Sequence, residues 1–546
     1  MQKYFKIVKD NLLLSTLYCV MGVLIALFNT LNVHYFQQVL DHLKLLFLSQ
    51  PLVYIYLGTL VILPIIGYLD EYAKNKLPER IYYGIKERTL TKLDTIQAQK
   101  IMTSSLGTLL QMIENGANAG RNVVFDFYFE IIRSIIPTIL FSLIFIGTIS
   151  TKLIWFIVLG YTIVFVVTHF LLRWLYAIKS KLLDNQESIN RILTHGVMSF
   201  LVYRITGQYK SQIRKFHQLT ESAATQKTAI ALVHEAFFAI FALLVNLIKG
   251  LVIVLVLTDH LQSLSVGQIV ALLLYIDNIY NPIAIFNVIY VQAKLDDVAY
   301  SKLNDFFRVA DDPGMLSAIP VKSPLAAITF TNVSYTLGSR VLFANVNLQM
   351  LRGQIYYLVG NNGSGKSTLV NILLGLIKNY DGQIKFDHQP ADAISLRSLY
   401  SRTSFLSQTA PVFAGTLREN IDVQHRLSNA EMMTILENVA LIDDVQQLPD
   451  GLETKVIESG ENLSGGQRQK LAFARLLAEA NYSELVIMDE ATSALDTASR
   501  FKILSHVWPA LENKIVMIVT HRMELIPKGS VLLTIRNQQV HTARKG

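Results

Sequence analysis

Six long apolar segments recur along this chain and constrain its fold more than any other feature. Each is close to the roughly 20 residues that a helix needs to cross a bilayer. In lipid, only helices and closed barrels satisfy their own backbone polar groups. The segments lie near 11–33, 52–70, 131–150, 152–173, 229–257 and 265–291. We therefore expect an all-α domain of six transmembrane helices over residues 1–309.

The composition and the first residues agree with a membrane protein. Hydrophobic residues make up 51% of the 546 residues, which is too many for an ordinary soluble enzyme. The basic start resembles a signal peptide, but the apolar stretch after it is too long and lacks a small-residue cleavage site. We expect a retained first helix. The single cysteine, Cys19, excludes an internal disulfide and a cysteine-based zinc site.

Lys and Arg are concentrated in two stretches, 71–130 and 173–228. The loops between the other spans hold only Lys44 and Lys152. Because basic loops remain cytoplasmic, we expect both termini and any C-terminal domain on the inside. This surplus explains the net charge of +8 better than nucleic-acid binding does, since no basic stretch is interleaved with stacking aromatics.

The two basic stretches keep helical spacing and predict membrane helices that extend into the cytoplasm. Residues 310–325, rich in Pro, Gly and Asp, are typical of a linker. From 326 to 546, short β-rich runs alternate with helical stretches. This alternation predicts a parallel α/β domain.

A phosphate-binding loop is predicted within IYYLVGNNGSGKSTLV, residues 355–370, which fits the P-loop pattern. The apolar strand delivers a glycine-rich loop whose N–H groups can close around phosphate, and the following helix N-terminus adds positive potential. Lys366 adds an ammonium, and the Ser367 hydroxyl can ligate Mg²⁺. The residues assigned to nucleotide binding here are Gly360, Asn361, Asn362, Gly363, Ser364, Gly365, Lys366, Ser367 and Thr368.

A second apolar strand ends in two carboxylates. In ELVIMDEATSALD, residues 484–496, Asp489 and Glu490 follow the strand directly. One carboxylate can hold Mg²⁺ while its neighbour polarises the attacking water. We predict Asp489 as the metal ligand and Glu490 as the catalytic residue.

The segment NLSGGQRQKLAFARLLAEA, residues 462–480, places a serine and two glycines at the start of an amphipathic helix. This is a second anion-binding helix N-terminus in the same domain. One chain cannot easily bring both termini to the same γ-phosphate, whereas two domains paired head to tail can. The residues assigned to this contact are Leu463, Ser464, Gly465, Gly466 and Gln467.

LSGGQ at 463–467 matches the signature of the ATP-binding cassette proteins, and the chain resembles their exporter-type half-transporters over essentially its whole length. The resemblance implies a six-helix transmembrane domain followed by an α/β P-loop NTPase domain. It also implies ATP and Mg²⁺ as cofactors, with ATP hydrolysis coupled to export.

The resemblance further implies roles for residues outside these motifs. Gln408 resembles the loop glutamine that senses Mg²⁺, and His521 resembles the switch histidine that contacts the γ-phosphate. Tyr335 takes the place of the aromatic residue that stacks on adenine. The run from Ser493 to Asp496 resembles the loop that crosses the dimer interface, and Glu458 resembles an acidic residue that contacts the coupling helices.

In such transporters two ATP molecules are sandwiched between paired domains, and closure moves the membrane helices. The resemblance places the coupling contacts near Met112 to Arg121 and Thr194 to Arg204, beside Gln408 and Glu458. Because Glu490 and the full signature are intact, we favour a homodimer over a heterodimer. The fused layout indicates a bacterial plasma membrane.

Polar side chains inside membrane spans are energetically costly and are therefore candidates for the transport pathway. They are His169, His234, Glu235, Asn246, Lys249 and Asp277. Alternatively, Lys249 and Asp277 can pair with each other. Mixed charge and many aromatics favour a mature peptide, an amphiphile or a drug-like molecule over a simple ion.

Other classes remain as alternatives. A soluble cassette ATPase would lack the six spans, and an importer has its membrane and ATPase parts on separate chains. An ATP-gated membrane regulator tends to lose the catalytic carboxylate. One half of a heterodimeric transporter for a lipid or thiol compound fits the same motifs.

Overall fold

The computed structural model describes residues 2–42, 50–102, 106–258, 264–457, 460–492, 494–523 and 526–545. The chain forms two compact units. The first unit comprises Met1–Leu93 and Ser104–Val309, and the second unit comprises Asp94–Thr103 and Ala310–Gly546.

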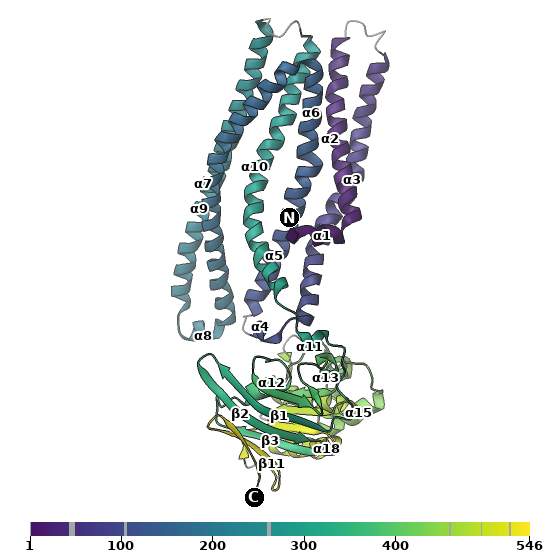
Figure 1. The fold of residues 1–546 in the computed structure, drawn as a ribbon, viewed down its shortest axis with the longest axis vertical. Helices are drawn as coiled ribbons and strands as arrows, with labels where there is room; N and C mark the ends of the chain where they lie inside the picture. Colours follow the sequence, from purple (N-terminus) through teal and green to yellow (C-terminus); the bar gives the residue numbers. More distant parts are fainter. Residues whose placement is uncertain are drawn as a thin grey trace. The chain divides into compact units, whose positions relative to one another are not determined.

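Long helices make up the first unit (Figure 1). In chain order they are α1 (Gln2–Asp10), α2 (Leu12–Asp41), α3 (Gln50–Thr95), α5 (Leu106–Asn122), α6 (Ile136–Ile149), α7 (Thr151–Met198), α8 (Phe200–Ile205), α9 (Tyr209–Leu257) and α10 (Val266–Arg308). Between α5 and α6 the helix widens into two π-helical segments, η2 (Val123–Phe129) and η3 (Ile131–Ile135). A single extended residue, Ser150, separates α6 from α7, so the tight hairpin predicted there is present.

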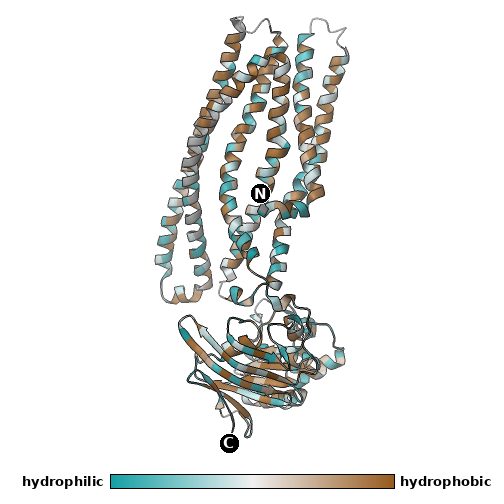
Figure 2. Cartoon of the chain, viewed as in Figure 1, coloured by the Kyte–Doolittle hydropathy of each residue, from teal (hydrophilic) through white to brown (hydrophobic). Residues whose placement is uncertain are grey.

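Within the described residues, five helices are long and apolar enough to cross a membrane. They contain five of the six predicted spans, and the remaining span, 152–173, falls within α7. Within that span, Thr151–Gly160 is a shorter apolar helix. Most side chains of the span beyond Gly160 lie outside the described residues. Figure 2 shows α7 and α9 apolar over much of their length and more hydrophilic toward α8, as expected of membrane helices with polar extensions.

The core of the first unit is organised around α10, which packs against α2, α5 and α6. Buried Tyr280 of α10 donates a hydrogen bond to the backbone oxygen of Ile157 at 3.0 Å. This close approach depends on Gly160, where a Cβ atom would lie 2.7 Å from the Tyr280 hydroxyl. A second fixed contact is the buried ion pair between Arg133 and Asp70, at 2.7 Å.

The first inner stretch turns earlier than the resemblance suggested. Met112 and Arg121 lie inside α5, whereas the segment that belongs to the second unit is 94–103, which carries α4 (Ala98–Met102). There the N–H of Asp312 donates to the backbone oxygen of Thr95 at 2.7 Å, and the Thr95 hydroxyl donates to Asp311 at 2.6 Å. Continuous helical spacing over 71–130 hides the position of the turn from sequence reasoning.

The second unit is built on two main sheets. An antiparallel sheet has the order β2-β1-β4-β5, and a six-stranded sheet has the order β12-β11-β3-β10-β9-β6. Their strands are β1 (Ala327–Leu337), β2 (Arg340–Leu351), β3 (Gln354–Gly360), β4 (Asp381–Phe386), β5 (Gln389–Pro390), β6 (Thr403–Leu406), β9 (Leu485–Asp489), β10 (Ile515–Val519), β11 (Val531–Arg536) and β12 (Gln539–Arg544). A short pair, β7 (Gly415–Thr416) and β8 (Lys455–Val456), lies apart.

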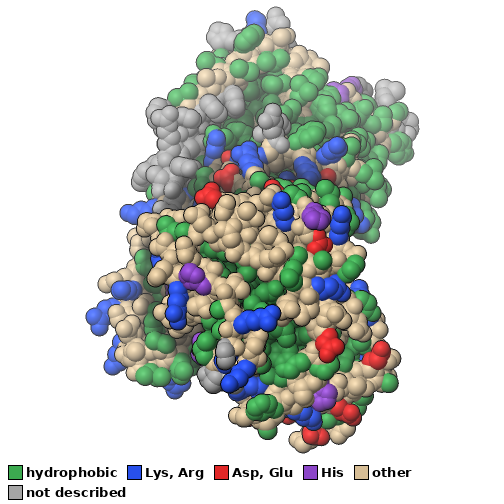
Figure 3. Space-filling view, turned by 60° about the horizontal axis from the view of Figure 1, so that its bottom comes forward, with side chains coloured by type: hydrophobic (Ala, Val, Ile, Leu, Met, Phe, Trp, Pro, Cys, Tyr) green, Lys and Arg blue, Asp and Glu red, His purple; other side chains and the backbone are tan. Residues whose placement is uncertain are grey.

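Helices surround these sheets. They are α11 (Pro313–Leu316), α12 (Lys366–Leu373), α13 (Leu396–Tyr400), α14 (Leu417–Ile421), α15 (Asn429–Asn438), α16 (Ile442–Gln446), α17 (Gly465–Glu479) and α18 (Thr497–Ala510), with a 3-10 turn at Gly451–Glu453. On the face of the second unit seen in Figure 3, charged side chains of both signs are interspersed with apolar and uncharged groups.

The six-stranded sheet is parallel from β11 through β3, β10 and β9 to β6, with β12 antiparallel at one edge. β3, β9 and β10 are almost continuously apolar and buried, as expected of strands covered on both faces. Because parallel strands end at one edge, the residues after β3, β9 and β10 meet there.

Glu484 ties the start of the second unit to this sheet. Its carboxylate, 14% exposed, accepts hydrogen bonds from the Ser323 hydroxyl and the Leu325 N–H, both at 2.5 Å, and from Arg402 at 3.2 Å. Burial raises the pKa of Glu484, but these hydrogen bonds and the Arg charges outweigh it and hold the pKa below its usual value.

We expect Glu484→Gln to destabilise the fold at neutral pH by about 1.5–3 kcal/mol, the usual contribution of a hydrogen bond to a charged group. The folded pKa lies below the unfolded value of about 4.3. The stabilisation is therefore present above the unfolded pKa and is lost as pH falls through the folded pKa. Thermal unfolding across pH should show a difference from wild type that shrinks in acid. Exposed Glu512→Gln is the control, and a difference independent of pH would contradict this assignment.

Candidate nucleotide-binding site

The predicted phosphate loop connects β3 to α12. Gly363 and Gly365 adopt φ angles of +74° and +101°, in the region that favours glycine. A Cβ atom on Gly365 would also lie 2.7 Å from the ring of Phe343. The loop can therefore close tightly only with glycine at this position.

Lys366 is 9% exposed, and its ammonium donates to the backbone oxygens of Gly360 and Asn361 at 2.9 and 3.2 Å. Within the described part of the chain, the buried Ser364 hydroxyl has no hydrogen-bond partner. A buried hydroxyl without a partner is costly. A buried cation and a free hydroxyl in a loop at a helix N-terminus are a donor set that suits phosphate oxygens. Asn361, Asn362 and Ser367 are exposed beside it.

Asp489 ends β9 at the same edge of the sheet, since β9 and β3 both pair with β10. Burial raises the pKa of Asp489, the charge of Glu490 raises it further, and the Lys366 ammonium lowers it. A bound cation would act in the same direction as Lys366 and favour the ionised carboxylate.

Glu490 brings the three predicted catalytic residues together. Its carboxylate accepts a hydrogen bond from Gln408 Nε2 at 3.1 Å and lies 3.0 Å from His521 Nδ1. Its backbone has φ +48°, which is uncommon for a residue other than glycine, and its N–H donates to Val519. Such strain persists only where surrounding structure holds it. The Glu490 carboxylate thus joins three separate segments of the chain, namely its own, that of Gln408 and that of His521.

The LSGGQ segment forms the first turn of α17, as predicted. Ser464 caps the helix by accepting from the Gln467 N–H at 3.1 Å, and the Gln467 side chain accepts from the Ser464 N–H at 2.9 Å. Behind this turn, the N–H of Ala494 donates to Gln469 at 2.9 Å. Ser464 and Gly465 are exposed.

The phosphate loop and the LSGGQ turn are attached to different hydrophobic cores. Leu369 and Leu373 of α12 belong to the core that contains both sides of the β1–β2 hairpin, whereas Leu471 and Phe473 of α17 belong to a second core with α14 and α15. Among the described residues, no hydrogen bond joins the two motifs.

Two further predicted residues, Tyr335 and Asp496, make contacts within the fold. Tyr335 is 3% exposed in the core, paired with Phe343 across the hairpin. The expectation that it stacks on adenine is wrong, because strand alternation turns it inward. Asp496 is the N-cap of α18, accepting from the Ser499 N–H at 2.9 Å, and this contact lowers its pKa. Ser493 and Glu458 lie outside the described residues.

Two residues that sequence reasoning missed lie near the loop. Arg340 donates to the backbone oxygen of Gly363 at 3.1 Å. Leu337, two residues after Tyr335, is 57% exposed at the end of β1. Leu337 has the same strand parity as buried Tyr335 and is exposed only because the register of β1 shifts directly after Tyr335, so alternation alone does not identify it. Nothing in the sequence pattern identifies Arg340.

The polar residues predicted in the spans behave differently from one another. Lys249 and Asp277 form an ion pair at 2.5 Å, so they satisfy each other. Glu235 and Asn246 are exposed, and His234 is partly buried. The side chain of His169 lies outside the described residues.

Replacing Gly365 with alanine should disrupt nucleotide binding. Gly353→Ala is the matched control, because Gly353 also has positive φ (+76°) but has nothing within 4 Å of a built Cβ. Both variants should lose about 1 kcal/mol of stability from backbone strain. Only Gly365→Ala should also weaken nucleotide affinity, by about tenfold or more, measured by equilibrium binding of a fluorescent ATP analogue. Equal affinities in the two variants would argue against the tight-loop geometry.

Known proteins agree with this geometry. The family model described as ABC transporter matches residues 343–493. Heavy metal tolerance factor 1 of Caenorhabditis elegans is 24% identical over 443 residues, covering 80% of this chain and 55% of that protein. A putative export ATP-binding/permease protein of Rickettsia bellii is 23% identical over 494 residues, covering 87% and 83%.

A solved structure of a bacterial Atm1-family ABC exporter with ATP bound has the same fold. Its TM-score is 0.84 at 18% identity, with 98% of this chain and 96% of that chain covered. The expected fold class, a helical membrane domain followed by an α/β nucleotide-binding domain, is therefore confirmed. The chain therefore carries an ABC transporter domain over residues 343–493 and has the fold of an exporter half in which a helical membrane domain is fused to one ATP-hydrolysing domain.

Proposed function

We propose that this chain is an ATP-driven exporter that works as a homodimer and moves an amphiphile, a mature peptide or a drug-like molecule out of a bacterial cell. The observation that carries the proposal is the Glu490 carboxylate held between Gln408 and His521 at 3.1 and 3.0 Å. An intact carboxylate in this setting supports hydrolysis rather than nucleotide sensing alone. The names of the Rickettsia protein and of the solved exporter support the outward direction.

Each residue of the site has a role in this proposal. The loop from Gly360 to Thr368 binds the phosphates of ATP through N–H groups and the Lys366 ammonium. Mg²⁺ would be held by Ser367, Gln408 and Asp489 together with phosphate oxygens. This fits the usual binding of Mg²⁺ through one or two carboxylates and substrate phosphates. In the described part of the chain there is no cluster of three or more His, Cys, Asp or Glu residues that could hold a metal ion.

Hydrolysis needs a polarised water and stabilised charge on the γ-phosphate. Glu490 orients and polarises the water, and His521 contacts the phosphate from the neighbouring strand end. Because both side chains already meet in one cluster, little reorganisation is needed when ATP enters.

Two observations support a pair of chains. The LSGGQ turn is exposed and attached to a different core from the phosphate loop, which suits a contact with a second chain's nucleotide. In the first unit, exposed apolar side chains gather around α8; they are Val197, Met198, Phe200, Leu201, Val202 and Ile205. An apolar patch of this kind usually marks a protein interface.

The basic stretches 71–130 and 173–228 support a cytoplasmic location for the ATPase domain and both termini, in a bacterial plasma membrane. The chain's own residues leave the class of amphiphile open at this point.

The variant Glu490→Gln should bind ATP and lose hydrolysis by about a hundredfold or more, the scale expected when a water-positioning group is removed. ATPase activity of the purified chain in lipid measures this, with Glu512→Gln as a surface control. Unchanged hydrolysis in Glu490→Gln would remove the proposed catalytic role.

If each ATP site is formed by two chains, two different inactive variants should restore activity when they are expressed together. Lys366→Ala and Gly466→Asp homodimers should each be inactive, whereas co-expression should restore about a quarter of wild-type ATPase activity. Random pairing makes half of the dimers mixed, and each mixed dimer holds one intact site. A built Cβ at Gly466 lies no closer than 3.6 Å to its neighbours, so the Asp variant can fold.

The control for this experiment is a chain carrying both substitutions, co-expressed with wild type. Its mixed dimers contain no intact site, so they should add no activity to that of the wild-type pairs. Failure of the two single variants to complement each other would exclude shared sites and the homodimer with them.

A further inference from the structure

We infer that a cavity in the first unit, between α2, η2, α7 and α10, binds the positively charged head of an amphiphile. The inference rests on the proposed exporter function and deepens it by assigning the charge of the substrate. The cavity has a volume of about 460 Å³, within the usual range of small-molecule pockets.

The charge of its lining favours cations. Three carboxylates, Asp126, Glu130 and Asp296, face one ammonium, Lys179. Asp296 is satisfied by hydrogen bonds from Asn122 and Gln292, all at 3.2 Å. Over the described residues, Asp126 and Glu130 accept no hydrogen bond and form no ion pair. Two carboxylates are thus free to receive a charged ligand.

Other nearby cations are already engaged. Arg133 pairs with buried Asp70 at 2.7 Å, and Arg121 donates to the side-chain oxygen of Asn122 at 3.0 and 3.2 Å. Lys179 donates to Gln292 at 3.2 Å. The amide contacts do not cancel the charges of Arg121 and Lys179, and Arg121 still acts on Asp126 through its charge. Among the described residues, however, no ion pair fixes a counter-ion on Asp126 or Glu130.

Aromatic rings form much of the remaining wall. Phe125 stacks on Tyr18 with ring centroids 4.9 Å apart, and Phe127 lies nearby. The Arg133 guanidinium lies 3.8 Å from the Tyr18 ring centroid, so a ring of this wall already accepts a cation on its face. Aromatic faces beside carboxylates suit organic cations, whose apolar groups pack on the rings.

The π-helical geometry explains how these groups come together. In η2 the wider turns place Phe125, Asp126 and Phe127 at the cavity, with Glu130 directly after. π-Helical turns are rare in proteins, and those that occur often lie at functional sites. The segment is braced because Arg133 of η3 packs on Gly22 of α2, where a Cβ would lie 2.5 Å from the Arg133 Cβ.

Position along the helix also fits an amphiphile. Asp126 and Glu130 directly precede the span predicted at 131–150, so they lie at its end rather than at its middle. Carboxylates can remain ionised there at a lower cost than in the bilayer centre. A bound amphiphile could keep its apolar part against the apolar residues of the span.

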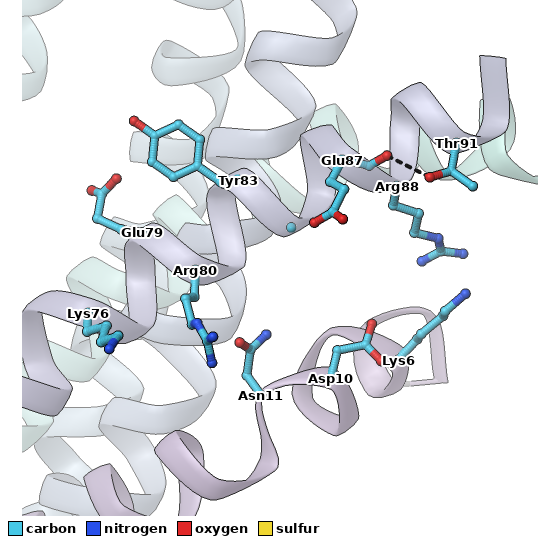
Figure 4. A pocket seen from close by; sticks show the side chains of 11 residues that line it. Lys6, Asp10, Asn11, Lys76, Glu79, Arg80, Tyr83, Glu87, Arg88 and Thr91 are labelled. Carbon is cyan, nitrogen blue, oxygen red and sulfur yellow. Dashed lines mark hydrogen bonds between the residues drawn. The ribbon is translucent and has the colours of Figure 1, made fainter. Parts of the chain in front are cut away.

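A second pocket in the same unit provides the contrast. It lies between α1 and α3, has a volume of about 640 Å³, and is lined by four basic and three acidic side chains. Figure 4 shows Arg80 directed toward α1, with Glu79 beside it on α3. The charges that line this second pocket nearly cancel, and Tyr83 supplies the aromatic ring of its lining. The second pocket therefore has no comparable preference for cations.

The test uses two ions of the same shape and opposite charge, tetraphenylphosphonium and tetraphenylborate, with the full-length chain in lipid nanodiscs. Equilibrium binding to wild type should be saturable for the phosphonium and absent or much weaker for the borate. Asp126→Asn and Phe127→Leu should each weaken phosphonium binding about fivefold or more. Glu79→Gln, from the charge-balanced pocket, should bind the phosphonium like wild type.

Two results would overturn the inference: equal binding of both ions, or unchanged phosphonium affinity in Asp126→Asn and Phe127→Leu chains that unfold at the wild-type temperature. If one of these variants fails to fold, the other variant and the comparison of the two ions in wild type still decide. ATPase activity of Glu490→Gln, measured in parallel, separates the two proposals. A wild type that hydrolyses no ATP would overturn the exporter, and retained hydrolysis in Glu490→Gln would overturn the catalytic role of Glu490. Charge-blind binding by a chain whose hydrolysis Glu490→Gln abolishes would overturn only the cation site.

Discussion

The parallel pairing of β3, β10 and β9 is the constraint on which the nucleotide site depends. It fixes the carboxyl ends of three buried strands at one edge, so the phosphate loop, the two carboxylates and the segment carrying His521 meet without any long-range side-chain contact to position them. Glu490 is then oriented by side-chain contacts with Gln408 and His521, which come from other segments of the chain. The site is therefore as rigid as the sheet that carries it.

In the membrane unit the corresponding constraint is the absence of water to satisfy polar groups. The structure meets it with internal pairs, Arg133 with Asp70 and Lys249 with Asp277, and with helices that satisfy their own backbones. Free carboxylates at Asp126 and Glu130 stand out against this background. Glu130 is partly buried, whereas Asp126 is exposed, and a charge withdrawn from water is costly unless it is paired.

Sequence reasoning reached the architecture and most of the site because these rest on strong local signals. Twenty-residue apolar runs, a glycine loop after a buried strand, and LSGGQ at a helix start each carry their own physical explanation. Sequence reasoning failed where the placement of a side chain depends on strand register or on a turn. Tyr335 and Leu337 share strand parity and differ in exposure because the register of β1 shifts between them, and Arg340 reaches the loop from a hairpin whose geometry no motif encodes. The π-helical widening at 123–135 is invisible in composition, since its aromatic and β-branched residues also occur in the ordinary helices of the other spans.

Segment 94–103 has a consequence for how the protein is made. Thr95 and its partner Asp311 are 216 residues apart in the chain, yet both belong to the second unit. During synthesis this short piece leaves the ribosome long before the rest of its unit exists, and it must wait while the four remaining predicted spans are inserted into the membrane. The second unit thus cannot complete its own surface from its contiguous part alone, and the membrane helices must already be in place when it does.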